Sequence, residues 1–484
     1  MARNQKVPTI DPHDKRLRKL AHLLDEMVEE KAGPEASFEE KSDVAAGLAG
    51  NAQWLREEWR VRRATTTAKE VMVKGVRYRQ MEQPSSAVYF GRYGAHEVVE
   101  PLYRQVGAHN GPTIKPLEAR VGIIGNMMPD FARIVMEHGA DEDSRETERR
   151  LKIDGLVPPS RAFIAKRQGE VAHELKVQAA HLEAEARKAT PSITGVSTVS
   201  CGMDRMAVRM VEPLGPGVQK AKGPHRTEPY ERTPPDPKTY DYRMAWVGNT
   251  SAHDADGNLL HTWRYALDAQ SDPALIARRV TAQVKALVDA NRSVTVLCIQ
   301  DEGKELRILP ATLQATLGPD VSVGRLTDFE HLAGYLDDVV NATEADGDPR
   351  NYKHWYRDEL LRDDEAIHRI WDWLLRRARD HPRGGSKAAR TAIGKALRYI
   401  RKRKHRMRYA THRAANRPVG SGETEATCGL MQLRVKRAGQ SWETPGLSGI
   451  LSLRSIVLSG SFPATWKAFA AKSRKEVRDA RHAR

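Results

Sequence analysis

Apolar positions along the first 190 residues switch between helical spacing and strand-like alternation. Residues 13–70 have helical spacing, and one apolar face is marked by Leu17, Leu20, Leu23, Leu24 and Met27. Residues 71–105 form short β-rich stretches, which predict β-strands. Residues 116–188 return to helical spacing, with Ser160 as an expected N-cap. Two short helices followed by a third in this stretch are compatible with a helix-turn-helix or with ordinary helical packing.

From about residue 193 onward, the pattern predicts strands that alternate with helices, as in an α/β sheet. A hairpin is expected at 242–267 with its turn at 254–257, followed by a helix with Ser271 as its N-cap. The continuous apolar run at 293–300 is typical of a buried central strand, and 321–326 predicts a further strand.

The first strand of this sheet shows a change of phase. Apolar residues occupy odd positions up to Met203 and even positions from Met206 onward. Because side chains alternate between the two faces of a strand, this change predicts a bulge or bend near Asp204 and Arg205.

Positive charge is concentrated in two segments toward the C-terminus. The 484-residue chain carries 79 Lys and Arg against 63 Asp and Glu, a formal net charge of +16. Residues 376–417 contribute a net +15 and residues 467–484 a further +5, so the rest sums to −4. Such segments usually bind a polyanion such as nucleic acid, because each phosphate that they neutralise releases condensed counterions. Interleaved apolar residues such as Leu397 and Ile400 predict that the first segment folds into helices.

The sequence has no feature that favours a membrane or secreted protein. No apolar run approaches the roughly 20 residues of a membrane-spanning helix, and residues 1–16 contain no segment suited to a signal peptide. Cys201, Cys298 and Cys428 are too scattered for a disulfide framework or a CxxC zinc site. We therefore expect a reduced, cytoplasmic, nucleoid-associated protein with no membrane partner.

Two acidic residues occupy positions typical of a ligand site in an α/β sheet. Asp301 directly follows the buried strand at 293–300, and such sites gather at the carboxyl ends of strands. Asp204 lies within the first strand, where a carboxylate is costly to bury unless it is paired or holds a metal ion. Mg²⁺ and Mn²⁺ prefer carboxylate oxygens, and two ions about 4 Å apart can hold both reacting oxygens of a phosphoryl transfer. A third acid would complete such a site.

The third acid is expected in the segment 418–442, which begins with a tight Gly-Ser-Gly loop at 420–422. Glu423 and Glu425 both follow this loop, at the start of a helix predicted over about 423–437. The expected buried stripe of that helix consists of Ala426, Leu430 and Leu433.

These segments resemble the transposases of bacterial insertion sequences of the Kra type, a ribonuclease-H-like, Mutator-related DDE family. The C-terminal signature carries most of the resemblance, in GSGETEATC, LRVKRAGQSW and GLSGILSLRSIVLSGSFPATW. Further matches are YFGRYGAHEVVEPLYR, PLEARVGI, MPDFARIV and PPSRAFI, so the resemblance covers roughly residues 85–466. It implies an α/β fold with a ribonuclease-H-like catalytic domain, a helical insertion, and mainly α-helical N-terminal domains.

The resemblance assigns the catalytic residues one by one. The first catalytic Asp of the family falls on Asp204 in VSCGMD, and the second falls on Asp301 in VLCIQDEG. The catalytic Glu falls on Glu425 and not on Glu423.

Other residues are expected to support this centre or to hold DNA. Asp328 and His331 match an Asp-Phe-x-His segment of the family and are expected to support the metal ligands or contact DNA. DNA contacts are also expected from residues of the insertion and of the helix at 423–437 with its following loop, namely Arg401, Lys402, Arg403, Lys404, Arg406, Arg408, Arg434, Lys436, Arg437 and Trp442.

The changes of pattern and the resemblance divide the chain into six segments. These are a helical region at 1–75, a small β segment with a helix-turn-helix-like DNA-binding region at 76–190, the first part of the catalytic core at 191–345, a basic helical insertion at 346–410, the second part of the core at 411–466, and a basic tail at 467–484. Recognition of the DNA ends is expected from the N-terminal helical region.

The resemblance implies metal-dependent DNA strand cleavage and strand transfer at the ends of an insertion sequence. Asp204, Asp301 and Glu425 would hold two Mg²⁺ or Mn²⁺ ions, which activate water or a 3′-hydroxyl and stabilise the leaving oxygen. The expected partner is double-stranded DNA, at the element ends and at the target. A homodimer or higher multimer is expected to bind it.

Two alternatives from other functional classes remain open. The first is a transposase-derived DNA-binding protein without catalysis, which Arg205 favours because family members usually have glycine after the first Asp. The second is a metal-dependent structure-specific DNA nuclease, such as a junction resolvase, which would use the same acids. Inverted repeats flanking the coding sequence would favour the transposase, whereas cleavage of branched DNA regardless of end sequence would favour the resolvase.

Overall fold

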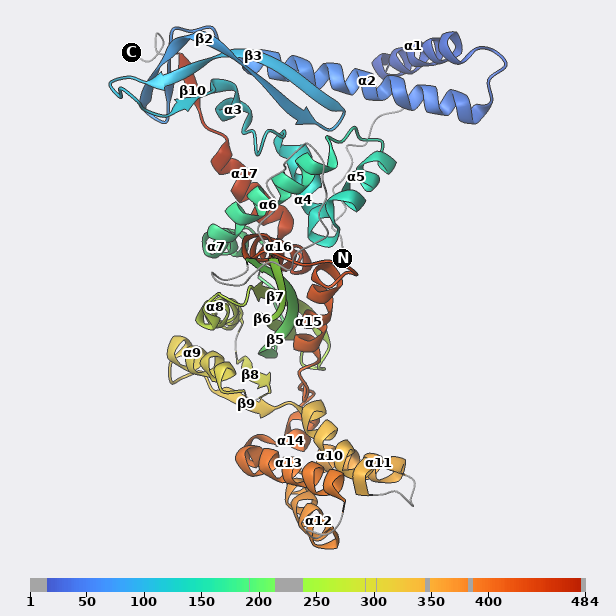
Figure 1. The fold of residues 1–484 in the computed structure, drawn as a ribbon, viewed down its shortest axis with the longest axis vertical. Coiled ribbons are helices and arrows are strands. Elements are labelled where there is room, and N and C mark those ends of the chain that lie inside the picture. Colours follow the sequence, from blue (N-terminus) through green and yellow to red (C-terminus); the bar gives the residue numbers. More distant parts are fainter. Residues whose placement is uncertain are drawn as a thin grey trace, which may run out of the picture. The chain divides into compact units, whose positions relative to one another are not determined.

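The chain forms two compact units, Met1–Val171 with Lys467–Arg484, and Ala172–Trp466 (Figure 1). The boundaries fall within helices α6 (Arg161–Val177) and α17 (Phe462–Ser473). The structure, a computed structural model, describes residues 15–190, 192–213, 238–291, 293–301, 303–343, 349–381 and 386–479.

The first unit combines helices with an antiparallel sheet. Its helices, besides parts of α6 and α17, are α1 (Lys15–Ala32), α2 (Phe38–Ala64), α3 (Pro116–Val121), α4 (Pro129–Asp141) and α5 (Ser144–Ile153). Its strands are β1 (Glu70–Val73), β2 (Val76–Gly91), β3 (Gly94–Gln105), β4 (Thr113–Ile114) and β10 (Val477–Asp479). They pair antiparallel in the order β10-β1-β2-β3-β4. The helical and strand segments predicted before residue 190 are therefore confirmed.

The second unit is an α/β domain, as the sequence predicts. Its strands are β5 (Thr198–Pro213), β6 (Lys238–His253), β7 (Leu259–Leu267), β8 (Thr295–Gln300) and β9 (Val323–Thr327). Its α-helices, besides parts of α6 and α17, are α7 (Ala179–Ala189), α8 (Pro273–Ala290), α9 (Ile308–Leu317), α10 (Phe329–Thr343), α11 (Pro349–Arg362), α12 (Ala366–Asp380), α13 (Lys387–Arg403), α14 (Tyr409–Ala414), α15 (Gly422–Val435) and α16 (Thr444–Leu458). Two short 3-10 helices are η1 (Glu305–Arg307) and η2 (Lys404–Arg406).

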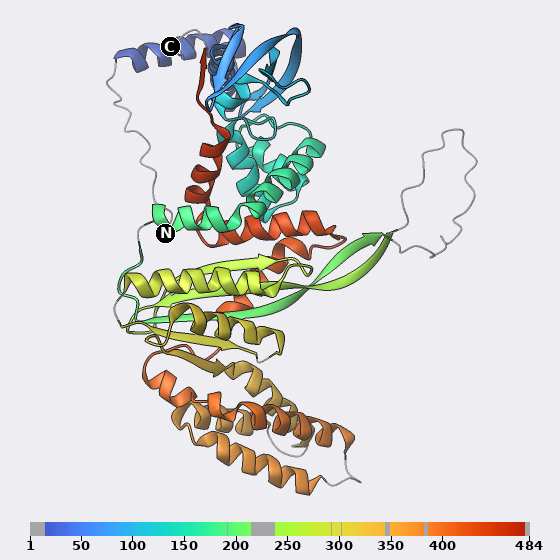
Figure 2. The ribbon, with the colours of Figure 1, turned by 90° about the vertical axis from the view of Figure 1, so that its left-hand side faces the viewer.

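The sheet of the second unit has the strand order β7-β6-β5-β8-β9. Strands β5, β6 and β7 are antiparallel to their neighbours in this set, whereas β8 runs parallel to β5 and β9 runs parallel to β8. The hairpin predicted at 242–267 corresponds to β6 and β7, and the strands predicted at 293–300 and 321–326 correspond to β8 and β9. Helix α8 lies along one face of this sheet (Figure 2).

Helix α8 begins with a different cap from the one predicted. Asp272, and not Ser271, is the N-cap, and its side chain accepts a 2.9 Å hydrogen bond from the N–H of Ala274. Pro273 then occupies the first helical position, where its missing N–H leaves no intrahelical bond unmade.

The bulge predicted near Asp204 is wrong. Pairing between β5 and β6 continues without a register shift from Thr198 to Pro213. Instead, the two halves of β5 bury opposite faces. Residues up to Met203 pack with α8 and α9, whereas residues from Met206 onward pack with α15 and α16. The change of phase therefore reflects a change in the covering helices and not in the backbone.

The helices between β9 and α15 have a hydrophobic core of their own. Its largest side chains include Tyr356, Trp373 and Tyr399, which come from α11, α12 and α13. The helices predicted for the basic segment 376–417 are confirmed by α12, α13 and α14. None of the described helices is both long enough and apolar enough to cross a membrane.

Candidate active site

Asp204 and Asp301 lie at matching positions on two adjacent parallel strands. The parallel pairing of β5 with β8 ends at the pair Cys201 and Cys298. Each acid stands three residues beyond this pair, Asp204 within β5 and Asp301 directly after β8. Because neighbouring strands lie about 4.8 Å apart, the topology brings the two acids to the same part of the sheet.

Helix α15 packs against these strands at Gly202. A Cβ atom at Gly202 would lie 2.3 Å from Oγ1 of Thr424 and 2.6 Å from the carbonyl oxygen of Ile299. The Thr424 hydroxyl also donates a 2.6 Å hydrogen bond to Oδ1 of Asn249, on the neighbouring strand β6. The missing side chain at Gly202 thus lets the first turn of α15 pack directly on the sheet. Glu425 is the next residue of that turn.

The buried face of α15 is not the one predicted. Its buried residues are Thr424, Thr427, Cys428, Met431, Arg434 and Val435. The predicted stripe is wrong, since Ala426 is exposed and Leu433 is 66% exposed. The physical reason is that the threonine hydroxyls find partners inside the fold. Thr424, for example, donates a 2.6 Å hydrogen bond to Oδ1 of Asn249 on β6.

Glu423, the alternative third acid, is directed toward β7. Its Oε2 accepts a 3.1 Å hydrogen bond from the Thr262 hydroxyl and lies 3.4 Å from a guanidinium nitrogen of Arg264. These contacts occupy its carboxylate, so Glu425 is the acid of this turn that remains for a site with Asp204 and Asp301.

Asp328 connects the start of α10 with the Gly-Ser-Gly loop. It directly follows β9 and is completely buried. Its Oδ1 accepts a 2.6 Å hydrogen bond from the N–H of Ser421. Its Oδ2 accepts hydrogen bonds from the backbone N–H of His331 (2.9 Å) and from Nδ1 of the same residue (2.8 Å). Burial alone would raise the pKa of Asp328, but the hydrogen bonds from His331 and Ser421 together lower it.

The imidazole of His331 lies among the acids. The hydrogen bond to Asp328 raises the pKa of His331 to about 9, and the charges of Asp301 and Glu425 act in the same direction. One ligand atom each of Asp328, His331 and Glu425 lies within 4.8 Å of the others. Because Asp328 engages Nδ1, the nitrogen left for a further partner is Nε2. Because its pKa is raised, the ring is protonated at neutral pH, and Nε2 is a hydrogen-bond donor.

Cys428 lies between Asp204 and Glu425. Its thiol donates a 3.7 Å hydrogen bond to Oδ2 of Asp204. Burial raises the pKa of the Cys428 thiol to about 12, and the charges of Asp204 and Glu425 contribute. The thiol is therefore protonated at neutral pH, and it is a weak donor to the Asp204 carboxylate.

We call Asp204, Asp301, Asp328, His331 and Glu425 the acidic cluster.

Asp301 contains a buried oxygen without a partner. Its Oδ1 is shielded from solvent and accepts no hydrogen bond within the described part of the chain. A buried carboxylate oxygen without a partner is costly, and a divalent cation would relieve that cost. Carboxylate oxygens are the ligands that Mg²⁺ and Mn²⁺ prefer, and in the described part of the chain the donor atoms that lie close enough together to share one ion are those of Asp328, His331 and Glu425.

Arg205 extends from the other side of the sheet. Successive residues of a strand face opposite sides, and the Asp204 side is the one covered by α15. The guanidinium carbon of Arg205 lies 5.6 Å from the ring centroid of Trp246, and one of its nitrogens lies 4.0 Å from a carboxylate oxygen of Glu305. The arginine that stands where the family usually has glycine is therefore not part of the acidic cluster.

Most residues expected to contact DNA lie at the surface. Those with exposed side chains are Arg401, Lys402, Lys404, Arg408, Lys436 and Arg437. Arg403 and Arg406 are half-buried, and the guanidinium of Arg403 lies over the ring of Tyr399 at 4.2 Å. The end of α13 and the turn after it thus present cations that phosphate groups can reach.

Arg434 and Trp442 instead stabilise the fold. Arg434 is only 3% exposed, and its guanidinium lies 5.1 Å from the centroid of the Trp442 ring. The indole N–H of Trp442 donates a 3.0 Å hydrogen bond to the carbonyl oxygen of Val435, and its backbone forms a β-bridge with Met210. The DNA contact predicted for Arg434 does not fit this placement, because almost no guanidinium surface is left for a phosphate. Both residues hold the end of α15 against β5.

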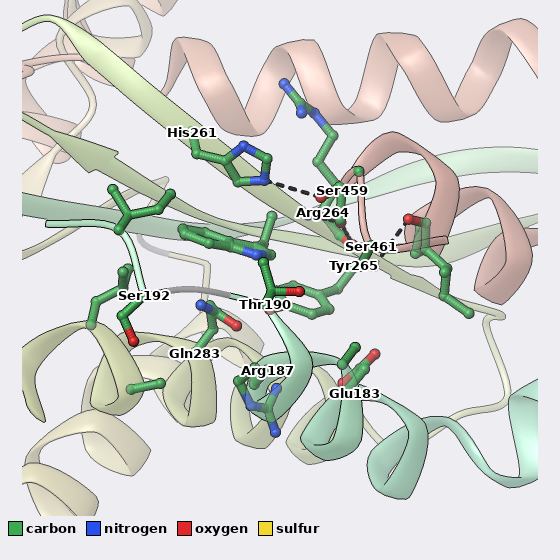
Figure 3. Close-up of a pocket in the computed structure, with 18 residues that line it drawn as sticks. Glu183, Arg187, Thr190, Ser192, His261, Arg264, Tyr265, Gln283, Ser459 and Ser461 are labelled. Atoms are coloured by element: carbon green, nitrogen blue, oxygen red, sulfur yellow. Dashed lines mark hydrogen bonds between the residues drawn. The ribbon is translucent and has the colours of Figure 1, made fainter. Parts of the chain in front are cut away.

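A cavity of about 210 Å³ lies beside β7 (Figure 3). Trp263, Tyr265 and Leu287 provide apolar walls, and Gln283 and Arg187 provide polar groups. No member of the acidic cluster lines this cavity. The candidate active site is therefore the acidic cluster and not this cavity.

Two residues that shape the site were not predicted from the sequence, namely Gly202 and Asn249. A glycine inside a strand often marks a close approach of another backbone or side chain, so Gly202 in VSCGMD carried a usable signal. Asn249 carried a weaker one, as a polar residue within the apolar strand MAWVGNTS.

A scan against protein-family models finds no model that matches this chain, and a search of curated proteins finds no significant relative. Function is therefore inferred from the geometry of the acidic cluster and from the resemblance of the motifs.

Proposed function

We propose that this protein is a DDE-class transposase that cleaves and transfers DNA strands at the ends of an insertion sequence. The observation that carries the proposal is the placement of Asp204 and Asp301 at matching positions on two adjacent parallel strands, with Glu425 in the group that includes Asp328 and His331. Asp204, Asp301 and Glu425 come from β5, the end of β8 and the start of α15, and Asp301 brings a buried oxygen that has no hydrogen-bond partner in the described part of the chain.

The topology supports this function. Three antiparallel strands followed by two parallel strands, in the order β7-β6-β5-β8-β9, is the arrangement expected of a ribonuclease-H-like domain. Helices α11, α12 and α13 lie between α10 and α15, which agrees with the insertion at 346–410 that the family resemblance implies.

Each part of the site has a role in this proposal. Two divalent cations held by Asp204, Asp301 and Glu425 would supply an activated oxygen nucleophile and stabilise the leaving oxygen. Asp328 orients the His331 ring and fixes the loop that begins α15. The exposed cations at the end of α13 bind the DNA backbone, with an affinity that falls as salt rises. We propose that the protein acts as a dimer or higher multimer on double-stranded DNA.

The experiment compares cleavage by the wild type with cleavage by Asp301→Asn and Glu425→Gln. The substrate is supercoiled DNA that carries the inverted repeats flanking the gene, with Mg²⁺ or Mn²⁺ present. Both variants should lose cleavage by at least about 100-fold, because each removes a charged ligand from the reacting centre. Binding to the same DNA in EDTA should be retained. Asp256→Asn, an exposed acid in the turn between β6 and β7, is the matched control and should cleave like the wild type.

Three results would contradict the proposal. Wild-type protein that binds the ends but never cuts them would favour a DNA-binding protein without catalysis. Cleavage that persists in Asp301→Asn would exclude the assigned centre. Cleavage of branched DNA without regard to end sequence would favour the structure-specific nuclease.

A further inference from the structure

Strands β5 and β6 continue beyond the sheet as a two-stranded ribbon, which consists of residues 205–211 and 240–246 (Figure 2). Parallel pairing of β5 with β8 has ended before Arg205, and antiparallel pairing of β6 with β7 reaches only Trp246. One face of the ribbon, with Met206 and Val208, is covered by α15 and α16. On the opposite face, the side chains of Tyr240, Tyr242 and Met244 are exposed.

The exposed face carries aromatic rings beside arginines. Tyr242 pairs with Arg209, and Tyr240 lies two residues from Tyr242 on the same strand, so these three side chains lie on one face of the ribbon. Trp246, which pairs with Arg205 where the ribbon begins, is only 7% exposed. Tyr240 is 56% and Tyr242 is 65% exposed. The guanidinium carbon of Arg209 lies 4.5 Å from the ring centroid of Tyr240.

Exposed rings that alternate with cations are suited to single-stranded nucleic acid, whose bases stack on aromatic side chains while cations follow the backbone. Tyr240 and Tyr242 are two residues apart on one strand, so their rings are spaced by about 6.8 Å. That is about twice the 3.4 Å rise between bases stacked in a duplex. The two rings therefore match bases that have separated from one another.

We propose that this face of the ribbon binds an unpaired stretch of the DNA strand next to the cleavage position. Tyr240 and Tyr242 stack on successive bases, and Arg209 contacts the phosphate between them. The inference rests on the proposed function, and the ribbon begins at the residue that follows Asp204.

A duplex suits this face less well than a single strand. A β-ribbon that reads a duplex enters the major groove and presents polar side chains to the edges of the bases. The outer face of this ribbon instead presents Tyr240, Tyr242 and the 43% exposed Met244. The dense positive charge that a duplex backbone requires lies on α13 and the turn after it.

The test measures binding in EDTA, so that cleavage plays no part. Fluorescence anisotropy compares a blunt duplex with the same duplex carrying a ten-nucleotide single-stranded tail. The double variant Tyr240→Ala/Tyr242→Ala should bind the tailed duplex at least about tenfold more weakly than the wild type does, because each lost stacking contact weakens binding severalfold or more. It should bind the blunt duplex within about twofold of wild type. Tyr240→Phe/Tyr242→Phe, which keeps the rings, should restore tail binding.

Each other outcome overturns the inference. Unchanged tail binding in the alanine variant would show that the rings do not contact the strand. An equal loss on blunt and tailed DNA would show that the face binds duplex. Because both tyrosines are exposed, the alanine variant should keep the wild-type melting temperature, which is measured in parallel.

The cleavage assay separates this inference from the proposed function. Loss of tail binding in the alanine variant, without any metal-dependent cleavage by the wild type, would support the ribbon and overturn the transposase. Cleavage that depends on Asp301, with tail binding unaffected by the tyrosines, would support the transposase and overturn the ribbon.

Discussion

Two histidines of this protein lie among carboxylates, and they differ in how many of their ring nitrogens have a partner. His96 of the first unit is completely buried. Its Nδ1 lies 2.7 Å from Oε2 of Glu58, and its Nε2 lies 3.3 Å from Oε2 of Glu57. The His331 side chain of the second unit is 41% exposed, and among the residues that the structure describes only its Nδ1 is engaged, by Asp328.

The two clusters therefore serve different purposes. Both ring nitrogens of His96 are paired, and Trp54 stacks on its ring, so this cluster joins α2 to the β2–β3 hairpin. The acidic cluster of the second unit keeps Nε2 of His331 and Oδ1 of Asp301 available for a ligand. The same residue types thus build a structural contact in one place and a candidate site in the other, and unused bonding capacity distinguishes them.

The largest effect on stability should come from removing the histidine of the group His96, Glu57 and Glu58, which we call the paired cluster. His96→Ala leaves Glu57 and Glu58 without their shared partner and should lower the free energy of unfolding by about 3–5 kcal/mol. Chemical denaturation followed by circular dichroism measures this change. In the matched variant His331→Ala, Asp328 keeps the backbone N–H donors of Ser421 and residue 331, so the loss should be about 1 kcal/mol. Similar losses in the two variants would contradict the distinction between the clusters.

Added metal should stabilise the protein only through the acidic cluster of the second unit. A divalent ion at about 100 times its dissociation constant should raise the free energy of unfolding of wild type by about 2.7 kcal/mol. Asp301→Asn should abolish this increase, which thermal melting with Mg²⁺ or Mn²⁺ and with EDTA will reveal. His96→Gln is the control and should keep the full increase. An Asp301→Asn protein that still gains stability from metal would assign the ion to other ligands.

Filling the space at Gly202 should displace the first turn of α15 and, with it, Glu425 of the acidic cluster. Gly202→Ala places a Cβ atom against Oγ1 of Thr424 and the carbonyl oxygen of Ile299, which should cost about 1–3 kcal/mol of stability. Cleavage should fall by at least about tenfold, because Glu425 moves with its helix. In the control Gly324→Ala, the closest atom is a side-chain methyl of Leu297 at 3.0 Å, which can turn aside. Equal cleavage by both variants would contradict the role assigned to Gly202.

The paired cluster should make the stability of the first unit depend on pH. Burial would lower the pKa of His96, but its hydrogen bonds to Glu57 and Glu58 raise it. Because the folded-state pKa lies above the unfolded value of about 6.5, the protonated ring stabilises the fold fully below that pH. This contribution is lost as pH rises through the folded-state pKa. Denaturation at several pH values above 6.5 should show a decline in wild type that is weaker in His96→Gln.

The smallest effect is expected at Arg205, which follows Asp204 in β5. Arg205→Gly should change the cleavage rate by less than about threefold, since Arg205 and Asp204 face opposite sides of the strand. Stability should fall by no more than about 1 kcal/mol, the usual cost of glycine inside a strand. Single-turnover cleavage measures the rate. A tenfold gain in Arg205→Gly would show that the arginine does restrain the acidic cluster.

Local patterns predicted those features that depend on neighbours along the chain. The apolar run at 293–300 was enough to predict β8, and with it the place of Asp301 at the end of a buried strand. The turn at 254–257 between two alternating segments was enough to predict the hairpin of β6 and β7.

Features that depend on distant segments could not be predicted in this way. The burial of Thr424 depends on a hydrogen bond to Asn249, and the burial of Arg434 depends on its stacking on Trp442. The contact of His331 with Glu425 joins α10 to α15, which the whole helical insertion separates along the chain. Periodicity within one helix carries no information about such partners.

The continuous pairing of β5 with β6 means that the register of these strands decides whether Asp204 or Arg205 faces α15. A slip of one residue would turn every side chain of β5 to the other face. It would turn Met203 away from α8 and α9 and Met206 away from α15 and α16. It would also place Arg205, in place of Asp204, on the side of α15. A chain in the wrong register is thus destabilised in both halves of the strand, and the same burial ensures that the acid, and not the arginine, contacts Cys428 of α15.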